Sequence, residues 1–198
     1  MSSDTKFHIH HDAPEVVGRR ERLGVRLLIV ADGAFVFGMI FSYFYLRNLD
    51  QNGGWIPKGG HTFSAASGWM AVLPLVVGAL VHKLAQRDPS HQGSFSLITL
   101  AAYLYGGYYQ FNQLANMPFI DKESGAFEGA YASCWTVIAG ANMFHYIVAG
   151  FIALGLVLRS RRANVNPILE SWRIRTAASW FTWIAISGIA CAITTSFI

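Results

Sequence analysis

Two ionisable residues, Asp32 and His145, each lie inside a long apolar stretch of the 198-residue chain. A carboxylate within a membrane-spanning helix costs roughly 2.5 kcal/mol or more on insertion scales, so a sequence that keeps one is expected to give it a polar partner. Counted from the ends of their stretches, both residues lie near the middle of a bilayer. We predict that Asp32 and His145 form a hydrogen bond or share a proton, and that Asn142, one helical turn before His145, could join them.

Two interpretations of this intramembrane polar site are open from the sequence. In the functional one, it holds a proton; in the structural one, it fixes the register of the helices, as a polar residue does in a coiled-coil core. The sequence has no Cys-x-x-Cys pair, no histidine pair at haem-ligating spacing within its apolar stretches and no glycine-rich phosphate loop. We therefore expect no metal or redox cofactor in this chain, and any redox chemistry would belong to a partner chain.

The composition is that of an integral membrane protein. Hydrophobic residues make up 53% of the chain and charged residues 13%, against about 25% charged residues in soluble domains. The apolar stretches each reach the about 20 residues that a spanning helix needs, and they are too long, and lack the alternation, for strands. We predict an all-α bundle with a single membrane domain over residues 23–198. Its five spanning helices are expected at about 23–47, 64–86, 94–115, 131–158 and 175–197.

The basic residues predict the orientation of these helices. Lys and Arg concentrate in residues 1–26 and in the loops after the second and fourth helices, whereas the opposite side carries Arg47, Lys58 and Lys122. Loops rich in Lys and Arg stay on the cytoplasmic side, so we expect the N-terminus inside and the C-terminus outside. Since residues 1–22 lack the features of a transit peptide, a bacterial plasma membrane is the expected location.

Residues 1–22 are polar and are expected to form an N-terminal cytoplasmic tail, without the apolar core of a cleavable signal peptide. A metal site in this tail is conceivable, and the alternative is a mobile polar segment on the membrane surface. The histidines that could contribute to such a site are His8, His10 and His11.

Small residues recur at every fourth position on two of the predicted helices, a pattern that lets helix backbones approach closely. In the fourth helix this spacing is formed by Ala141, His145, Ala149 and Ala153. The residues assigned to helix packing or to a lipid cleft are Ala34, Gly38, Ser42, Trp69, Gln110 and Gln113.

Four further residues have a simpler expected role. Cys134 and Cys191 lie in apolar stretches and are expected to be small buried side chains without a disulfide. His82 and His91 flank the short loop between the second and third helices and are expected at the surface.

The order of short motifs along the chain is informative. The first helix shows Arg22-Leu23-Gly24, then Ala31-Asp32, and closes with Ser42-Tyr43-Phe44-Tyr45-Leu46-Arg47. The fourth opens with Tyr131-Ala132-Ser133 and continues to Gly140-Ala141-Asn142-Met143-Phe144-His145, and the fifth carries Trp180-Phe181-Thr182-Trp183. In order and spacing these motifs resemble subunit III of the haem–copper oxidases, the cytochrome c oxidase subunit 3 family, in its short five-helix bacterial form.

The chain departs from the family pattern at several positions. The intramembrane acid is usually Glu in the family and is Asp32 here, and Asn142 replaces the first of two histidines in the fourth helix. Gln113 stands where many members have an acid after the glutamine that corresponds to Gln110. The fifth helix keeps the aromatic run but has neither the His nor the Asp of the family.

The resemblance implies a non-catalytic subunit of a respiratory terminal oxidase. Such a subunit packs on the catalytic subunit I in a complex with subunit II, holds phospholipids in a cleft, and supports proton uptake and turnover stability. It binds no haem or copper itself, so these cofactors are expected in the partner subunits. Asp32 takes the place of the intramembrane acid and His145 that of its polar neighbour. No nucleic-acid partner is expected.

Three alternatives stay open. The first is the subunit III homologue of a nitric oxide reductase complex. The second is a small proton-coupled transporter that uses Asp32 and His145, although transporters usually show paired halves with interrupted helices. The third is a membrane anchor or assembly protein.

Overall fold

The computed structural model of the protein describes residues 12–50, 53–120, 126–162 and 166–197. The helices are α1 (Pro14–Asn48), α2 (Ala65–Arg87), α3 (Gln92–Ala115), α4 (Ala130–Ser160) and α5 (Pro167–Thr195), with a short 3-10 turn, η1 (Pro89–His91), between α2 and α3. The described residues form no strand beyond an isolated bridge between Ile120 and Phe127. The predicted all-helical fold is confirmed.

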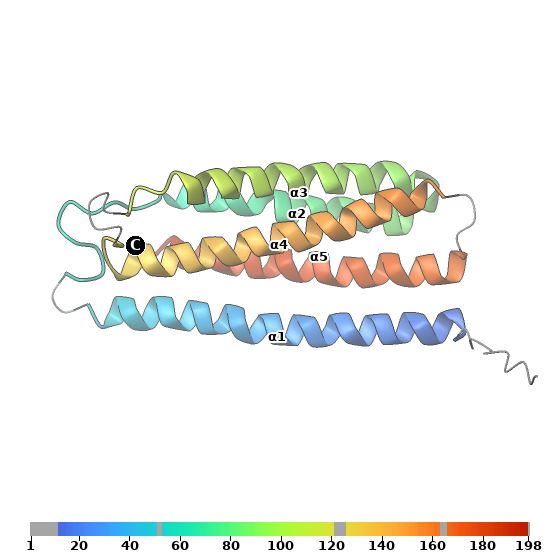
Figure 1. Ribbon diagram of the computed structural model, residues 1–198, viewed down its shortest axis with the longest axis horizontal. Coiled ribbons are helices and arrows are strands. Elements are labelled where there is room, and N and C mark those ends of the chain that lie inside the picture. The colour runs from blue at the N-terminus through green and yellow to red at the C-terminus, as the bar shows by residue number, and fades with distance from the viewer. Residues whose placement is uncertain (1–11, 51–52, 121–125, 163–165, 198) are drawn as a thin grey trace, which may run out of the picture.

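The five helices lie side by side along the long axis of the molecule, and each reverses the direction of the one before it (Figure 1). α2 packs against α3 and α5, and α3 also packs against α4. α1 packs mainly on α5 and touches α4 more lightly, so it forms an outer edge of the bundle (Figure 1). The N-terminal end of α1 and the C-terminal end of α5 therefore lie at opposite ends of the molecule.

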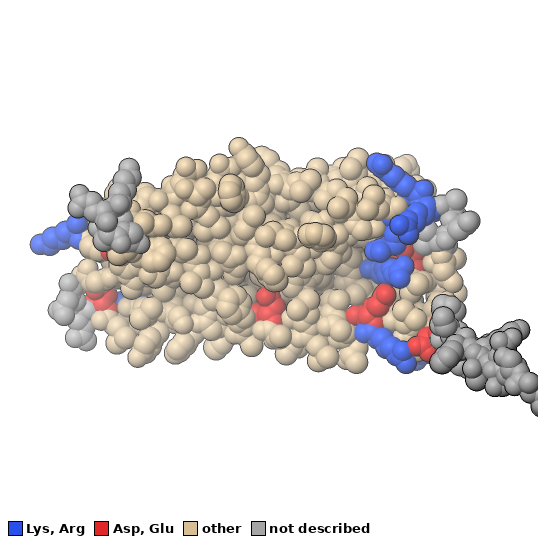
Figure 2. Space-filling view, viewed as in Figure 1, with Lys and Arg blue, Asp and Glu red and all other residues tan. Residues whose placement is uncertain are grey.

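Four helices within the described residues, α1, α2, α4 and α5, are long and apolar enough to cross a membrane. The chain is therefore a helical membrane protein. α3 has the length for a crossing, with 24 residues, but with its Tyr, Gln, Asn and Gly residues it is not among these four. Figure 2 shows charged side chains gathered at the two ends of the molecule, with a long uncharged surface between them and one acidic patch at mid-length.

α1 begins well before the predicted start of its apolar stretch at residue 23. It starts at Pro14, a residue suited to the first helical position. Residues 14–22, expected to belong to the polar tail, are therefore helical. The 35 residues of α1 span about 52 Å, which exceeds the about 30 Å of a bilayer's hydrocarbon core. The polar first turns thus extend beyond the apolar part of the helix.

Contacts with α5 hold these first turns of α1. A Cβ at Gly18 would lie 2.3 Å from Cγ of Trp172, so only glycine lets the two helices touch there. Nearby, Arg173 Nε lies 3.6 Å from Glu21 Oε1. These contacts depend on α5 also beginning earlier than the predicted residue 175. It begins at Pro167, where the Asn166 side chain accepts hydrogen bonds from the first backbone N–H groups.

The core of the bundle is built around buried aromatic rings. Tyr103 and Tyr146 fit between the helices because each faces a glycine of a neighbouring helix: a Cβ at Gly78 would lie 2.4 Å from the Tyr103 ring, and one at Gly106 would lie 2.3 Å from the Tyr146 ring. The Tyr146 hydroxyl donates to the carbonyl of Ala71 at 2.6 Å. A second cluster lies toward the end of the bundle that carries the C-terminus and includes Tyr43, Trp55, Phe119, Tyr131 and Trp135.

The two small-residue stripes have opposite environments. In α4, Ala149 and Ala153 are fully buried, as the pattern predicts. In α1, Ala34, Gly38 and Ser42 are exposed, and a Cβ at Gly38 would meet no atom within 4 Å. The α1 stripe, assigned from the sequence to helix packing or to a lipid cleft, faces outward, because α1 buries its opposite face.

Candidate functional site

Asp32 lies at the junction of three helices. His145 of α4 places Nε2 3.1 Å from both Oδ1 and Oδ2 of Asp32. Trp183 of α5 donates from Nε1 to Oδ2 of Asp32 at 2.6 Å. The indole also packs close to Gly33, the residue after Asp32, where an added Cβ would make an ordinary contact with the Trp183 ring at 3.4 Å. The predicted pairing of Asp32 with His145 is present in the structure, with Trp183 as a third member.

Because the Asp32 side chain is largely buried, its carboxylate needs hydrogen-bond donors from the protein. The side chain of Asp32 is 10% exposed and that of His145 is 2% exposed. A buried charge or polar group that lacks partners is costly, and the two donors on either side of the carboxylate supply them. The Trp180 ring packs edge-on to His145, with centroids 6.0 Å apart. We call Asp32, His145 and Trp183 the acid–histidine cluster.

A pocket of about 350 Å³ between α1 and α4 reaches this cluster. Asp32 and His145 lie in its wall together with Phe35 and Phe144. Because Trp183 can only donate, while a carboxyl group and an imidazole can exchange a proton, the arrangement can hold one proton between Asp32 and His145. The pocket is otherwise apolar enough to accept an acyl chain.

Asn142 does not join the acid–histidine cluster. It lines a separate cavity of about 20 Å³ with Gln110 and Gln113, a volume that accommodates one water molecule. Gln110 Nε2 donates to Gln113 Oε1 at 3.1 Å, and Gln113 Nε2 donates to the carbonyl of Ser67 at 3.2 Å. Gln110 and Gln113 thus join α3 to α2, in line with the packing role expected for them.

The remaining predicted positions lie elsewhere. Trp69 is 43% exposed on the outer side of α2. Cys134 and Cys191 are free thiols; Cys191 is buried, as predicted, whereas Cys134 is half-buried. The histidines of the tail, His8, His10 and His11, lie outside the described residues. No group of three or more His, Cys, Asp or Glu side chains within the described part of the chain comes together in a way that could hold a metal ion.

The expectation that His82 lies at the surface is wrong. His82 is 1% exposed, with Nε2 3.0 Å from the carbonyl oxygen of Ile174 and its ring edge-on to Phe181 at 4.9 Å. The loop that it precedes is short, but α5 begins early and covers this end of α2. The sequence distance between His82 and Ile174 concealed this contact.

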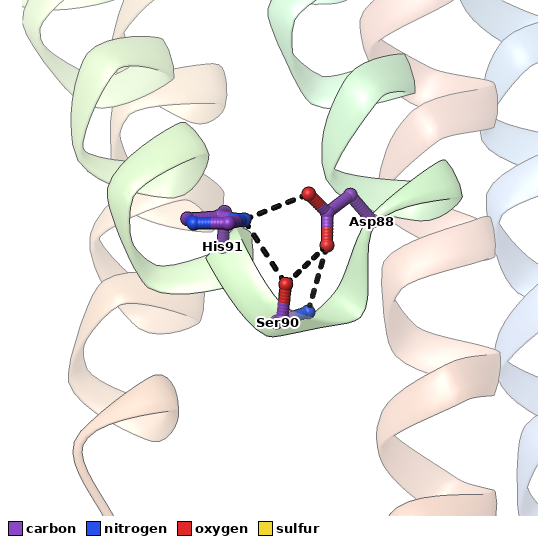
Figure 3. Close-up of polar contacts among 3 residues, drawn as sticks. All are labelled: Asp88, Ser90 and His91. Atoms are coloured by element: carbon purple, nitrogen blue, oxygen red, sulfur yellow. Dashed lines mark hydrogen bonds and ion pairs between the residues drawn. The ribbon is translucent and has the colours of Figure 1, made fainter.

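His91, in contrast, is exposed and belongs to a hydrogen-bonded turn between α2 and α3 (Figure 3). Its Nδ1 lies 2.7 Å from Asp88 Oδ2 and 3.0 Å from Ser90 Oγ, and the Ser90 backbone N–H donates to Asp88 Oδ1. The hydrogen bonds from Ser90 and His91 lower the pKa of Asp88 below its ordinary value. Although Ser, His and Asp meet here, the same ring nitrogen faces both partners, so this group caps a turn and is no catalytic relay.

Sequence reasoning missed Trp183. A tryptophan in the middle of a spanning helix needs a partner for its N–H group, and this need is the signal that could have indicated it.

The fold and the site define a helical membrane protein with a buried acid–histidine cluster midway along its helices. No protein-family model matches the chain, and no curated protein matches it. The resemblance to subunit III rests on the residues quoted above and stays a prediction.

Proposed function

We propose that the protein is the non-catalytic subunit III of a respiratory haem–copper oxidase. The observation that carries this proposal is the acid–histidine cluster, in which the intramembrane acid of the first helix meets the histidine of the fourth. The proposal rests on a resemblance in which these two residues stand at matching motif positions. The contact between Asp32 and His145 supports this interpretation of the motifs.

In this proposal all five helices cross a bacterial plasma membrane. α3 runs alongside α2 and α4, which are long and apolar enough to span, so it crosses with them, and its buried Ser96, Thr99 and Gln110 face its neighbours. The described Lys and Arg residues near the start of α1 and the ends of α2 and α4 lie at one end of the bundle. By the positive-inside rule, that end is cytoplasmic and the C-terminus is outside.

The outward face of α1 is the proposed contact with the catalytic subunit I. Only 17% of the most apolar stretch of α1 is buried, against 56% for α5. The exposed Ala34, Gly38 and Ser42 allow a helix of another chain to approach closely. Haem and copper would be held by the partner subunits.

The pocket between α1 and α4 is the proposed place of a structural phospholipid. The hydrogen bonds of Asp32 to His145 and Trp183 hold α1 at a fixed distance from the bundle, and the pocket lies on the side of α1 where its contact with α4 is light. Through this positioning the cluster would support proton uptake and turnover stability of the whole oxidase.

A pull-down in mild detergent, through a tag on the N-terminal tail, tests the proposal. A reduced-minus-oxidised optical spectrum of the eluate should show haem, with larger partner chains at a fixed ratio. The haem types and partner masses distinguish an oxidase from a nitric oxide reductase. A colourless eluate with this chain alone in several detergents would overturn both assignments, and proton flux in liposomes would then test the transporter alternative.

A further inference from the structure

A second pocket lies at the arginine-rich end of the bundle, away from the acid–histidine cluster. It has a volume of about 480 Å³ and is enclosed by the ends of four helices, α2, α3, α4 and α5. Its apolar wall includes Ala85, Pro167 and Ile174. Its polar wall carries three arginines, Arg159, Arg162 and Arg175, and one acid, Glu170. We call it the arginine pocket.

The charges in this pocket are not balanced. Arg159 Nε lies 3.6 Å from Glu170 Oε2, an ion pair too long to be a hydrogen bond, and the Glu170 side chain is 13% exposed. Arg162 and Arg175 form no ion pair with any described residue, although both line the pocket. Three guanidinium groups therefore line the pocket against one carboxylate, which leaves an excess of positive charge in its wall.

We propose that the arginine pocket binds the phosphate group of an anionic ligand. A guanidinium group presents parallel N–H donors that match the oxygens of a phosphate. The side-chain amides of Gln86 and Gln92 lie in the same wall and can donate as well. Basic pockets between helices at the border of a membrane are suited to anionic lipid headgroups, and a free phosphate ester offers the same chemistry.

The backbone at the start of α5 contributes little to this binding. The Asn166 side chain already accepts hydrogen bonds from the N–H groups of Ile168 and Leu169. The arginines therefore carry the recognition, and the site is defined by side chains that can be replaced one at a time. This inference does not rest on the oxidase assignment, because it uses only the pocket and its charges.

Thermal unfolding of the full chain in a neutral detergent tests the site. The probes are phosphatidylglycerol, phosphatidylcholine and inorganic phosphate, each titrated separately. The pocket variant is Arg162→Gln/Arg175→Gln. The matched control is Arg87→Gln/Arg161→Gln, which removes the same charge from exposed positions at the same end but outside the pocket.

We expect phosphatidylglycerol to raise the melting temperature saturably in the wild type and in the control. In the pocket variant its apparent affinity should fall by about fivefold for each arginine removed. Stabilisation by phosphatidylglycerol without an effect of millimolar phosphate would identify a lipid headgroup, and stabilisation by phosphate would identify a soluble phosphate anion as a ligand. Native mass spectrometry of each variant would show whether one lipid is retained.

Three results would overturn the proposal. They are stabilisation by neither anion, equal stabilisation by phosphatidylcholine, and an equal loss of affinity in the control and pocket variants. The last would mean that the whole basic end attracts anions without a defined site. If the double variant did not fold, the single variant Arg162→Gln would be compared with Arg161→Gln, with the same outcomes deciding.

Discussion

At the scale of single residues, the acid–histidine cluster combines three side chains that come from distant parts of the sequence. Asp32 cannot meet water at mid-membrane, so its two oxygens need donors from the protein. His145 and Trp183 supply them, at 3.1 Å and 2.6 Å. Each contact can be removed by a single substitution, which makes the cluster open to direct tests.

Trp183→Phe should destabilise the bundle by about 1–3 kcal/mol, because it removes one of the two hydrogen-bond donors to the buried Asp32. The midpoint of thermal unfolding in detergent measures this effect. Trp69→Phe is the matched control, since Trp69 is 43% exposed and has no place in the cluster. Equal melting temperatures for the two variants would show that the Trp183 hydrogen bond contributes nothing to stability.

Asp32→Asn keeps the shape of the side chain but leaves one oxygen where there were two. We expect the folded chain to persist and, in the proposed oxidase complex, turnover-linked inactivation to become several-fold faster, with less bound phospholipid. The loss of activity during continuous turnover and the phosphorus content of the complex measure these effects. An unchanged rate of turnover-linked inactivation together with an unchanged lipid content would contradict the positioning role of Asp32.

The turn between α2 and α3 gives a prediction that depends on pH. The hydrogen bond from Ser90, followed by that from His91, lowers the pKa of Asp88 from the ordinary value of 3.8 (Figure 3). Because the pKa is lower in the folded state, the stabilisation is fully present above 3.8 and is lost as the pH falls through the lowered value. In Ser90→Ala the carboxyl pKa, followed by ¹³C NMR, should rise toward 3.8. Ser171→Ala is the control, and an identical titration in all three proteins would contradict this assignment.

At the scale of elements, α1 differs from the other helices in how it is held. It contacts the bundle through α5 and, lightly, through α4. The contacts that hold it include Gly18 on Trp172 near its start, the Asp32 hydrogen bonds at its middle and the buried Tyr43 toward its end. Its opposite face is exposed, which is why its stripe of small residues is free for a partner chain.

Gly18→Ala should detach the first turns of α1 from α5, because the new methyl group would occupy the place of the Trp172 ring. Amide hydrogen exchange over residues 14–22 should become at least several-fold faster. Gly24→Ala in the same helix is the matched control: no atom lies within 4 Å of a Cβ there, so alanine should be neutral or stabilise by up to about 1 kcal/mol. Slow exchange in both variants would mean that the glycine contact does not hold these turns.

At the scale of the whole molecule, the alternating directions of the helices predict a membrane topology. If α3 crosses with the others, then His91 before it and Asn116 after it lie on opposite sides of the membrane. In intact cells an impermeant maleimide should label Asn116→Cys at once and His91→Cys only after permeabilisation. The wild type, with Cys134 half-buried and Cys191 buried, provides the background.

Labelling of both positions from one side would show that α3 does not cross. Labelling of His91→Cys alone in intact cells would keep the five crossings and reverse the orientation. The labelling therefore tests two things separately: whether α3 crosses the membrane, and which end of the bundle is cytoplasmic.

Much of this molecule is determined by local sequence. Apolar stretches of about 20 residues have to form helices in a membrane, because backbone groups there have no water to bond, and the helical fold follows. The pairing of Asp32 with His145 was also predictable, since two costly polar groups at matched depth satisfy one another. Only the tertiary structure decided that Trp183 completes this pair while Asn142 points to another cavity, because positions on a helix differ by rotation that depth alone does not specify.

The same reason explains the other differences. The polar composition of residues 14–22 and 167–174 is typical of a tail and a loop, but both segments are helical, and they pack on one another where Gly18 meets Trp172. His82 is buried because the early start of α5 brings Ile174 over it. The pocket between the ends of four helices, with Arg162 and Arg175 in its wall, exists only when those ends meet. The sequence by itself determined which segments are helices; the packing of one helix on another decided which of their residues face one another.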